Sequence, residues 1–298
     1  MPLGDAAARH GFRQVDVFGD GPVTGNPVAV LHDAADLDDD TMAALARWTD
    51  LSETTFLLPA TDPAADYRLR IFTPDRELPF AGHPTLGSAH AWLEAGGVPR
   101  DPDELVQECG VGTVRLRRVG DRLAFAAPPL VRGGPVDPEA LAPLLDALGL
   151  PDPAAVTARW IDNGPGWVGL LLPDPEVVLA LSPRTLAGFT SVGVASTYPA
   201  GAEVALEVRA FIGDSGAVRE DPVTGSLQAG FAGWLIADGH LPRRYVAAQG
   251  ARRRRRGRVH VEQVGTDTWI GGATTTVVTG HLALPRVAPP QPAREAPR

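Results

Sequence analysis

Two similar segments, about 140 residues apart, each pass from turn residues into a helix that is apolar on nearly every side. The first covers residues 79–93 (PFAGHPTLGSAHAWL) and the second covers residues 221–235 (DPVTGSLQAGFAGWL). A helix of this composition has to be buried. Its first N–H groups have no partner within the helix and carry partial positive charge, which suits a carboxylate or phosphate. Two such helix starts facing one cleft would hold a small anion from both sides.

The similarity extends upstream of both helices. Residues 70–72 (RIF) precede the first helix as residues 209–211 (RAF) precede the second, and residues 27–31 match residues 167–171 at nearly the same offset. One long offset indicates two duplicated halves rather than a solenoid, whose repeats are far shorter. The alternative is a chance match between alternating apolar strands, which look alike in any protein.

Composition excludes several classes of protein. The 298 residues are enough for two domains with real cores, and the net charge of −9 argues against nucleic acid as the main partner. The single cysteine, Cys109, excludes a disulfide within the chain and fits a reducing compartment. No apolar run reaches membrane-spanning length, and residues 1–6 lack the pattern of a signal peptide. We therefore expect a soluble, cytoplasmic protein with neither a membrane nor a nucleic acid as partner.

The pattern along the chain predicts alternating strands and helices, which is the α/β (α+β) class. We expect a helix at residues 39–48 and strands at 14–18, 28–31, 53–58, 67–72, 105–109, 113–118, 122–126, 268–273 and 274–278. A Gly/Pro-rich crossing ends near residue 136, so the predicted halves are residues 1–130 and 131–285. Residues 286–298 are proline-rich with almost nothing apolar to bury, which predicts a disordered tail.

Several sequence blocks resemble the phenazine-biosynthesis PhzF-like isomerases. They are residues 25–30 (GNPVAV), 51–56 (LSETTF), 72–74 with 82–85, 162–165, 220–226 (EDPVTGS) and 270–272. The blocks come in the family's order, and the resemblance covers residues 12–284. It implies a diaminopimelate-epimerase-like fold, in which each half is a curved mixed sheet wrapped around a central buried helix. The active site would then lie in the cleft between the halves. An enzyme without a cofactor is implied as well, and we also expect a homodimer.

Glu53 is the first candidate catalytic residue. It follows Ser52 at the start of an apolar strand, where a carboxylate needs a reason to be half-buried. Burial raises the pKa of a carboxyl group, which is what a proton shuttle near neutral pH requires. By resemblance, Glu53 matches the family's catalytic glutamate, which takes a proton from one carbon and returns it to a nearby one. The alternative is an exposed charge at a strand end.

The remaining candidates lie near the two helix starts. By resemblance, His83 and Asp221 lie in the pocket, where they orient the substrate and assist proton transfer. The alternatives are an ordinary turn histidine and a capping aspartate. The residues expected to bind the substrate are Gly82, Gly225 and Ser226, through backbone N–H groups and the Ser226 hydroxyl, and Asn26. Asn26 also fits a plain turn, because Gly-Asn-Pro is good turn sequence.

Two features suggest other functions. Cys109 looks like one half of a two-thiol epimerase, but such an enzyme needs a second cysteine and the chain has none. We therefore interpret Cys109 as a buried small hydrophobic residue. The basic run at residues 252–258 (RRRRRGR) is short and lies within an acidic chain. By resemblance, Arg254 and Ala217 stand where glycine is usual, which leaves the shape of the loop at Arg254 open.

We expect a cofactor-independent isomerase that shifts a proton and a double bond in a small carboxylate, with secondary metabolism as its setting. Glu53 has no carboxylate counterpart near Val194 in the second half, which favours one base over two opposed bases. A racemase or epimerase of a small amino or hydroxy acid is the second hypothesis, and a non-catalytic protein that binds small anions is the third. No motif predicts a metal, a nucleotide or a flavin.

Overall fold

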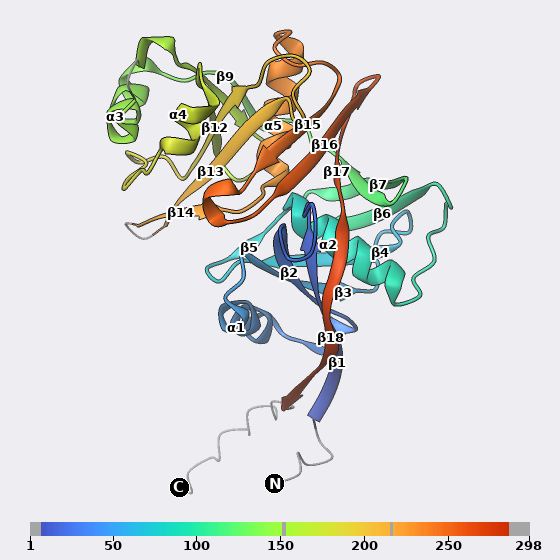
Figure 1. Cartoon of the computed structure of the whole chain (residues 1–298). Helices are drawn as coiled ribbons and strands as arrows, with labels where there is room; N and C mark the ends of the chain where they lie inside the picture. Colours follow the sequence, from blue (N-terminus) through green and yellow to red (C-terminus); the bar gives the residue numbers. More distant parts are fainter. Residues whose placement is uncertain (1–6, 151–152, 215–216, 286–298) are drawn as a thin grey trace, which may run out of the picture.

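The computed structural model describes residues 7–150, 153–214 and 217–285. Its strands belong to one sheet that curves through two stacked halves (Figure 1), the first drawn mainly in blue to light green and the second mainly in green to orange. The elements up to β8 are β1 (Ala7–Val17), β2 (Asn26–Leu31), η1 (Ala34–Asp36), α1 (Asp39–Thr49), β3 (Glu53–Leu58), β4 (Tyr67–Phe72), β5 (Glu77–Leu78), α2 (Gly82–Glu94), β6 (Glu104–Cys109), β7 (Gly112–Val119) and β8 (Arg122–Ala126).

The later elements repeat this plan. They are β9 (Arg132–Pro135), α3 (Pro138–Leu148), η2 (Pro153–Ala155), β10 (Thr157–Asp162), β11 (Trp167–Leu171), α4 (Pro175–Ala180), β12 (Ser191–Thr197), β13 (Leu206–Asp214), β14 (Ala217–Asp221), α5 (Gly225–Ala237), β15 (Arg244–Gln249), η3 (Ala251–Arg253), β16 (Gly257–Val264), β17 (Asp267–Gly272) and β18 (Thr274–Pro285).

Strand pairing confirms two similar halves. The antiparallel pair β1–β2 corresponds to β10–β11, and the parallel pair β2–β3 corresponds to β11–β12. The parallel pair β4–β6 likewise corresponds to β13–β15. Both halves are therefore mixed sheets with the same order of strands, as the duplicated sequence predicts.

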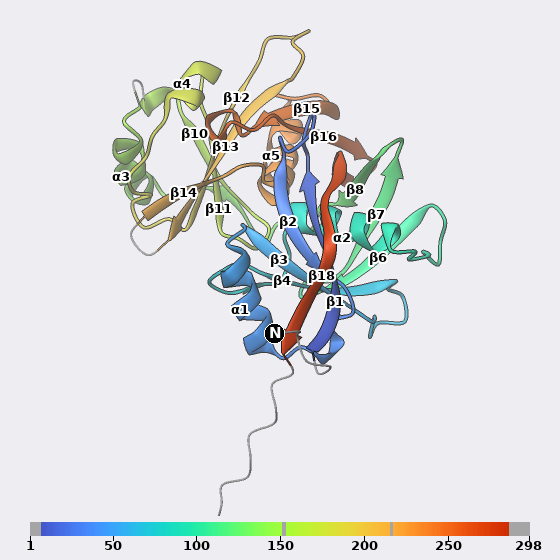
Figure 2. The ribbon, with the colours of Figure 1, turned by 60° about the horizontal axis from the view of Figure 1, so that its bottom comes forward.

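The halves are joined by an exchange of strands. β8 pairs with β17, and each of these strands runs on into the other half, where β9 pairs with β10 and β18 pairs with β1. Figures 1 and 2 show β18 in red beside β1 in blue. β18 is longer than the predicted strand at 274–278, because its pairing with β1 continues to Pro285. The proposed division at residues 130 and 131 falls between β8 and β9. Residues 286–298, predicted to be disordered, lie outside the described residues.

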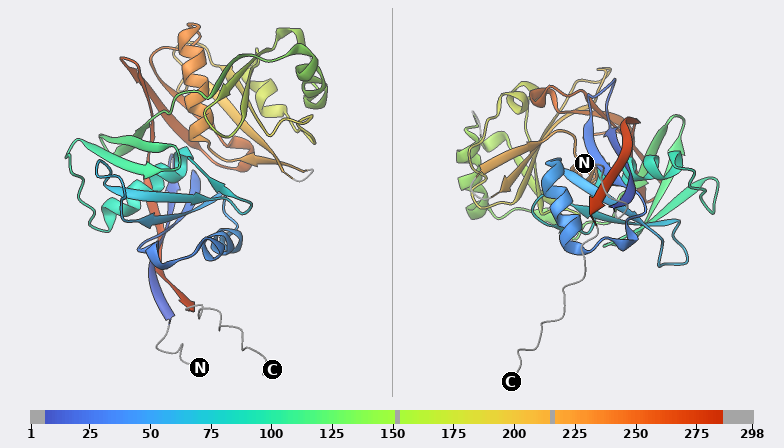
Figure 3. Two further views of the ribbon diagram at one scale, coloured as in Figure 1. Left: turned by 180° about the vertical axis from the view of Figure 1, so that it is seen from behind. Right: turned by 90° about the horizontal axis from the view of Figure 1, so that it is seen from below.

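Each half wraps around one buried helix. In Figure 3, left, the orange helix α5 lies inside the second half and the teal helix α2 inside the first. α2 contacts β1, β2, β3, β8 and β18, whereas α5 contacts β10, β11, β16 and β17. Both helices are buried on nearly every side, which explains their lack of a polar face. Within the described ranges, no helix is both long and apolar enough to cross a lipid bilayer.

The basic run at residues 252–258 joins the two halves. Arg254 has φ of 56°, in the left-handed region that glycine enters freely, so the turn keeps this conformation with an arginine in place. The backbone N–H of Arg256 donates to the carbonyl of Thr24 at 2.8 Å, and Nη1 of Arg255 donates to the carbonyl of Val23 at 2.6 Å. The run therefore fixes the loop that leads into β2.

Candidate active site

The first residues of α2 and α5 meet where the halves join. A Cβ atom on Gly82 would lie 2.9 Å from Cα of Gly225, and one on Gly225 would lie 3.1 Å from Cα of Gly82. The added atom on Gly82 would also lie 2.8 Å from the ring of Phe125. A side chain at Gly82 would require the two backbones to move apart, and one at Gly225 would be tightly crowded, so glycine suits both positions. The two helix starts are thus direct neighbours.

A cleft of about 300 Å³ lies beside these helix starts. Neither start has a side-chain cap or an acidic residue in its first turn, so its N–H groups and positive field are open to an anion. The residues that line the cleft come from both halves: Glu53, Thr73, Asp75, Arg76, Leu78, Ala81, Gly82, His83, Pro165, Trp167, Thr190, Ser191, Ile212, Gly213, Arg219, Asp221, Thr224, Gly225 and Ser226. Every candidate residue is among them except Asn26, which is fully buried and contacts two of them.

Glu53 and His83 face each other at the floor of this cleft. Oε2 of Glu53 lies 3.2 Å from Nε2 of His83, and their side chains are 14% and 4% exposed. The two atoms are close but not aligned as a hydrogen bond, so both are buried without a hydrogen-bonding partner among the described residues. Buried polar atoms rarely stay unpaired in folded proteins. Their orphaned state supports a ligand that supplies the missing partner.

The environment shifts the pKa values of this pair in opposite directions. Burial, followed by the negative charge of Asp221, raises the pKa of Glu53 to about 8, while Arg219 opposes the shift. Burial lowers the pKa of His83 to about 4, although Asp221 and a hydrogen bond to the Pro27 backbone act to raise it. Near neutral pH, the site therefore holds a carboxyl that exchanges its proton easily, beside a neutral imidazole.

Asp221, the last residue of β14, is held in one orientation by three donors. Nδ2 of Asn26 and Oγ of Ser52 donate to Oδ1, each at 3.1 Å, and Oγ1 of Thr224 donates to Oδ2 at 2.5 Å. Both oxygens of this carboxylate are thus occupied as acceptors. Asp221 is therefore a fixed negative charge that acts on the pKa of Glu53.

Asn26 connects the two halves at the site. It begins β2 in the first half, and its Nδ2 donates to the backbone carbonyl of Val223 in the second half at 3.0 Å. The same Nδ2 lies 3.3 Å from Nδ1 of His83. Nδ2 of Asn26 thus links His83 with Asp221, whereas Oδ1 of Asn26 is buried without a hydrogen-bonding partner among the described residues, so its contact with substrate stays a prediction.

Ser226 presents a free hydroxyl proton at the start of α5. Its Oγ accepts a hydrogen bond from Nε1 of Trp167 at 3.0 Å, and its carbonyl accepts one from Nδ2 of Asn163 at 2.9 Å. The hydroxyl donates to no acceptor in the part of the chain that the structure describes. Because Ser226 lines the cleft, this proton is available to a ligand oxygen.

Two arginines that no sequence motif indicates also line the cleft. Arg76 comes from the first half and Arg219 from β14, and neither side chain pairs with another described residue. Arg219 lies two residues before Asp221 in the same strand, and this spacing places both on one face. The alternation of side chains along a strand could therefore have predicted that Arg219 lies near Asp221. Arg76 lies in a polar turn, and its sequence alone does not indicate a role in the site.

Cys109 lies away from the cleft, at the end of β6, and does not line it. It is half-buried against the core of the first half, and burial raises the pKa of its thiol. A raised pKa disfavours the reactive thiolate. Within residues 7–150, 153–214 and 217–285, no group of three or more His, Cys, Asp or Glu side chains is arranged to hold a metal ion.

Comparison with known proteins gives consistent matches. The family model described as phenazine biosynthesis-like protein matches residues 15–280. Trans-2,3-dihydro-3-hydroxyanthranilate isomerase of Pseudomonas fluorescens is 36% identical over 78% of this chain and 82% of its own length. Antisense-enhancing sequence 1 of Schizosaccharomyces pombe is 40% identical, but this match spans 59% of the chain and 62% of the yeast protein. The crystal structure of a phenazine biosynthesis protein of the PhzF family from Enterococcus faecalis superimposes with a TM-score of 0.74 at 26% identity, covering 93% of this chain and 100% of that one.

Proposed function

The chain belongs to the phenazine biosynthesis-like family and is an isomerase, and we propose that it shifts a proton and a double bond within a small unsaturated carboxylate without a cofactor. The pairing of Glu53 with His83 carries this proposal. A single carboxyl of pKa about 8 faces the cleft and has no other partner. A homodimer, the proposed division of the chain and the absence of a cofactor stay predictions.

The proposed reaction begins with the substrate carboxylate at the two helix starts. The N–H groups at Gly82 and Gly225 and the hydroxyl of Ser226 hold its oxygens. Ionised Glu53 then removes a proton from a carbon next to the conjugated system, and the electron pair of the broken C–H bond spreads toward the carboxylate. The helix starts stabilise the charge that develops there, because their dipoles already point at it.

The second step returns the proton. Protonated Glu53 transfers it to a different carbon on the same face of the substrate, so one C–H bond breaks, one forms and no oxidant is needed. His83 supports Glu53 as a neutral neighbour 3.2 Å away, which does not draw the proton from the carboxyl. Burial, together with the charge of Asp221, keeps the pKa of Glu53 high enough for the proton to move in both directions.

The hydrogen bonds of Asp221 favour isomerisation over epimerisation. A two-base epimerase needs a free acid or base on each side of one carbon. Asp221 is the carboxylate that the second half supplies to the cleft, and its two oxygens already accept three hydrogen bonds. Its fixed position supports an electrostatic role rather than that of a second base.

Proton exchange in D₂O tests the proposal. The panel contains trans-2,3-dihydro-3-hydroxyanthranilate, simple cyclohexadiene carboxylates, proline and 4-hydroxyproline, each followed by NMR with the wild type and with Glu53→Gln. We expect deuterium in an unsaturated carboxylate with a shifted double bond, and none with the variant. Inversion of proline or hydroxyproline without a double-bond shift would contradict the proposed isomerisation and would support an epimerase activity. No exchange in any compound would support a binding protein.

A further inference from the structure

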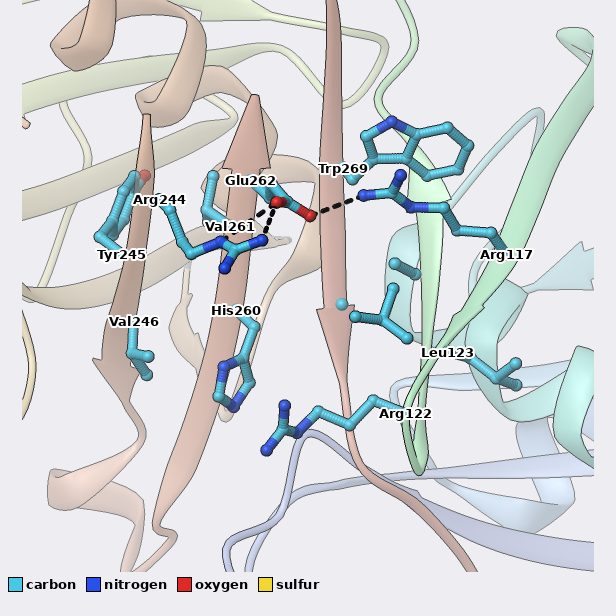
Figure 4. A pocket seen from close by; sticks show the side chains of 13 residues that line it. Arg117, Arg122, Leu123, Arg244, Tyr245, Val246, His260, Val261, Glu262 and Trp269 are labelled. Carbon is cyan, nitrogen blue, oxygen red and sulfur yellow. Dashed lines mark hydrogen bonds and ion pairs between the residues drawn. The ribbon is translucent and has the colours of Figure 1, made fainter. Parts of the chain in front are cut away.

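A second hollow lies on the face of the sheet where the two halves join, separate from the cleft. Its volume is about 390 Å³, and it shares no lining residue with the cleft. It spans five neighbouring strands in the order β7, β8, β17, β16 and β15, so both halves contribute to it (Figure 4). No step of the proposed reaction uses it.

The bottom of this hollow is apolar and is formed by small residues, so no large side chain fills it. Ala124 on β8 is paired with Gly271 on β17, which is paired in turn with His260 on β16. A Cβ atom on Gly271 would lie 2.9 Å from Cβ of Ala124, so a larger residue does not fit there without displacement. Val246 and Trp269 line the same hollow. Together these residues suit a small, flat, apolar body.

The charges around the hollow are mostly positive. Glu262 is the one acidic residue among those that line it, and it accepts hydrogen bonds from both Arg117, at 2.8 Å, and Arg244. The guanidinium of Arg117 also lies 4.1 Å from the centre of the Trp269 ring, which fixes its position. The negative charge of Glu262 is thus already neutralised by two cations, in a chain whose net charge is −9.

Two further polar groups in the hollow are Arg122 and His260. Figure 4 shows the guanidinium of Arg122 extending toward the ring of His260. The ion pair that Arg122 makes is with Asp121, at 3.8 Å, and the side chain of Asp121 is 86% exposed. The ring of His260 makes no hydrogen bond to any described residue. Burial, followed by the charge of Arg122, lowers the pKa of His260, whereas Asp121 and Asp20 act to raise it, so the imidazole is neutral near pH 7.

We propose that this hollow is a second binding site, for a small organic carboxylate. Its carboxylate would lie between Arg122 and His260, accepting a charge-assisted hydrogen bond from the guanidinium of Arg122 and a second hydrogen bond from the ring N–H of His260. Its apolar body would cover Ala124 and Gly271. Inorganic phosphate satisfies the two donors but leaves the apolar floor uncovered, so an aromatic carboxylate is the better match.

Histidine NMR tests this site without an activity assay. The protein has 7 histidines, so ¹³C-histidine labelling gives a small set of ring signals, and His260→Gln and His83→Gln identify two of them. The His260 signal reports the hollow and the His83 signal reports the cleft in one titration with sodium benzoate, at ionic strength held constant with NaCl. The titration therefore shows separately whether benzoate binds in the cleft and whether it binds in the hollow.

We expect a saturable shift of the His260 signal and a Kd for benzoate that rises at least about tenfold in Arg122→Gln. Arg118→Gln is the matched control. Arg118 follows Arg117 in β7, so its side chain points to the face of the sheet away from the hollow, and removing its charge should change Kd less than about twofold. Inorganic phosphate should bind at least about fivefold more weakly than benzoate.

Four results would overturn the proposal. The first is a His260 signal that stays still up to about 50 mM benzoate, a concentration that reveals even weak binding. The second is an equal loss of affinity in Arg118→Gln and Arg122→Gln. The third is phosphate binding as tight as benzoate binding, which would rule out an organic carboxylate. The fourth is a wild-type dimer in sedimentation velocity that Arg122→Gln dissociates while benzoate leaves His260 unmoved. That result would make the hollow a contact between two copies of the chain.

Discussion

The pKa of Glu53 predicts how the rate of isomerisation depends on pH. If ionised Glu53 takes the proton, kcat/KM follows the ionised fraction of a group whose pKa is about 8. That fraction is about one tenth at pH 7, about one half at pH 8 and about nine tenths at pH 9. We therefore expect kcat/KM to rise about tenfold from pH 7 to pH 9 and then level. His83 adds no inflection in this range, because its pKa is about 4.

Two variants test the cause of this profile. Glu53→Gln keeps the shape of the side chain but accepts no proton, so kcat/KM should fall at least about 100-fold, or about 2.7 kcal/mol of transition-state stabilisation, and the remaining rate should not rise with pH. Asp221→Asn removes the negative charge that raises the pKa of Glu53, so the inflection should move to lower pH. The assay is the initial rate of product formation by NMR at constant ionic strength. A Glu53→Gln enzyme with the wild-type profile, or a wild-type rate that falls between pH 7 and pH 9, would refute the reasoning.

Three further outcomes follow from the structure. The folded-state pKa of Glu53, about 8, lies above the ordinary value of 4.5, so stability is lost as the pH rises through this window. Glu53→Gln should therefore raise the melting temperature at pH 8 more than at pH 5 in a thermal scan. Gly225→Val should weaken binding of the substrate at least about tenfold in calorimetry, whereas Gly233→Val on the open side of the same helix should not. Cys109→Ser should keep kcat/KM within about twofold in the isomerase assay, and a larger loss in a folded variant would revive a thiol mechanism.

The sequence predicts the halves and the neighbouring helix starts because both depend on short-range patterns. Duplicated segments take the same local structure, and a helix that is apolar on every side has to lie inside its sheet. Two glycines that open such helices can then approach closely, as Gly82 and Gly225 do. The strand exchange is less visible, since nothing in β18 alone indicates that its partner is β1, at the other end of the chain.

The chemistry of the site depends on contacts that no local pattern contains. Family resemblance names Glu53 and His83, yet their 3.2 Å contact and their opposite pKa shifts come from burial between elements far apart in sequence. The role of Asn26 is also tertiary, because a turn motif in the first half donates to Asp221 in the second. At Arg254 the sequence leaves the shape of the turn open, and the structure shows that arginine takes the left-handed backbone conformation that glycine adopts freely.

The central claim is that one carboxyl moves one proton between two carbons on one face of the substrate. The most direct measurement uses a turnover substrate carrying deuterium at the donor carbon, converted in H₂O under single-turnover conditions and analysed by NMR. Because the side chain of Glu53 is only 14% exposed, part of the deuterium should reach the acceptor carbon before it exchanges with water. Complete loss of deuterium to solvent together with inversion at a single carbon would contradict the account, because that result requires two opposed bases.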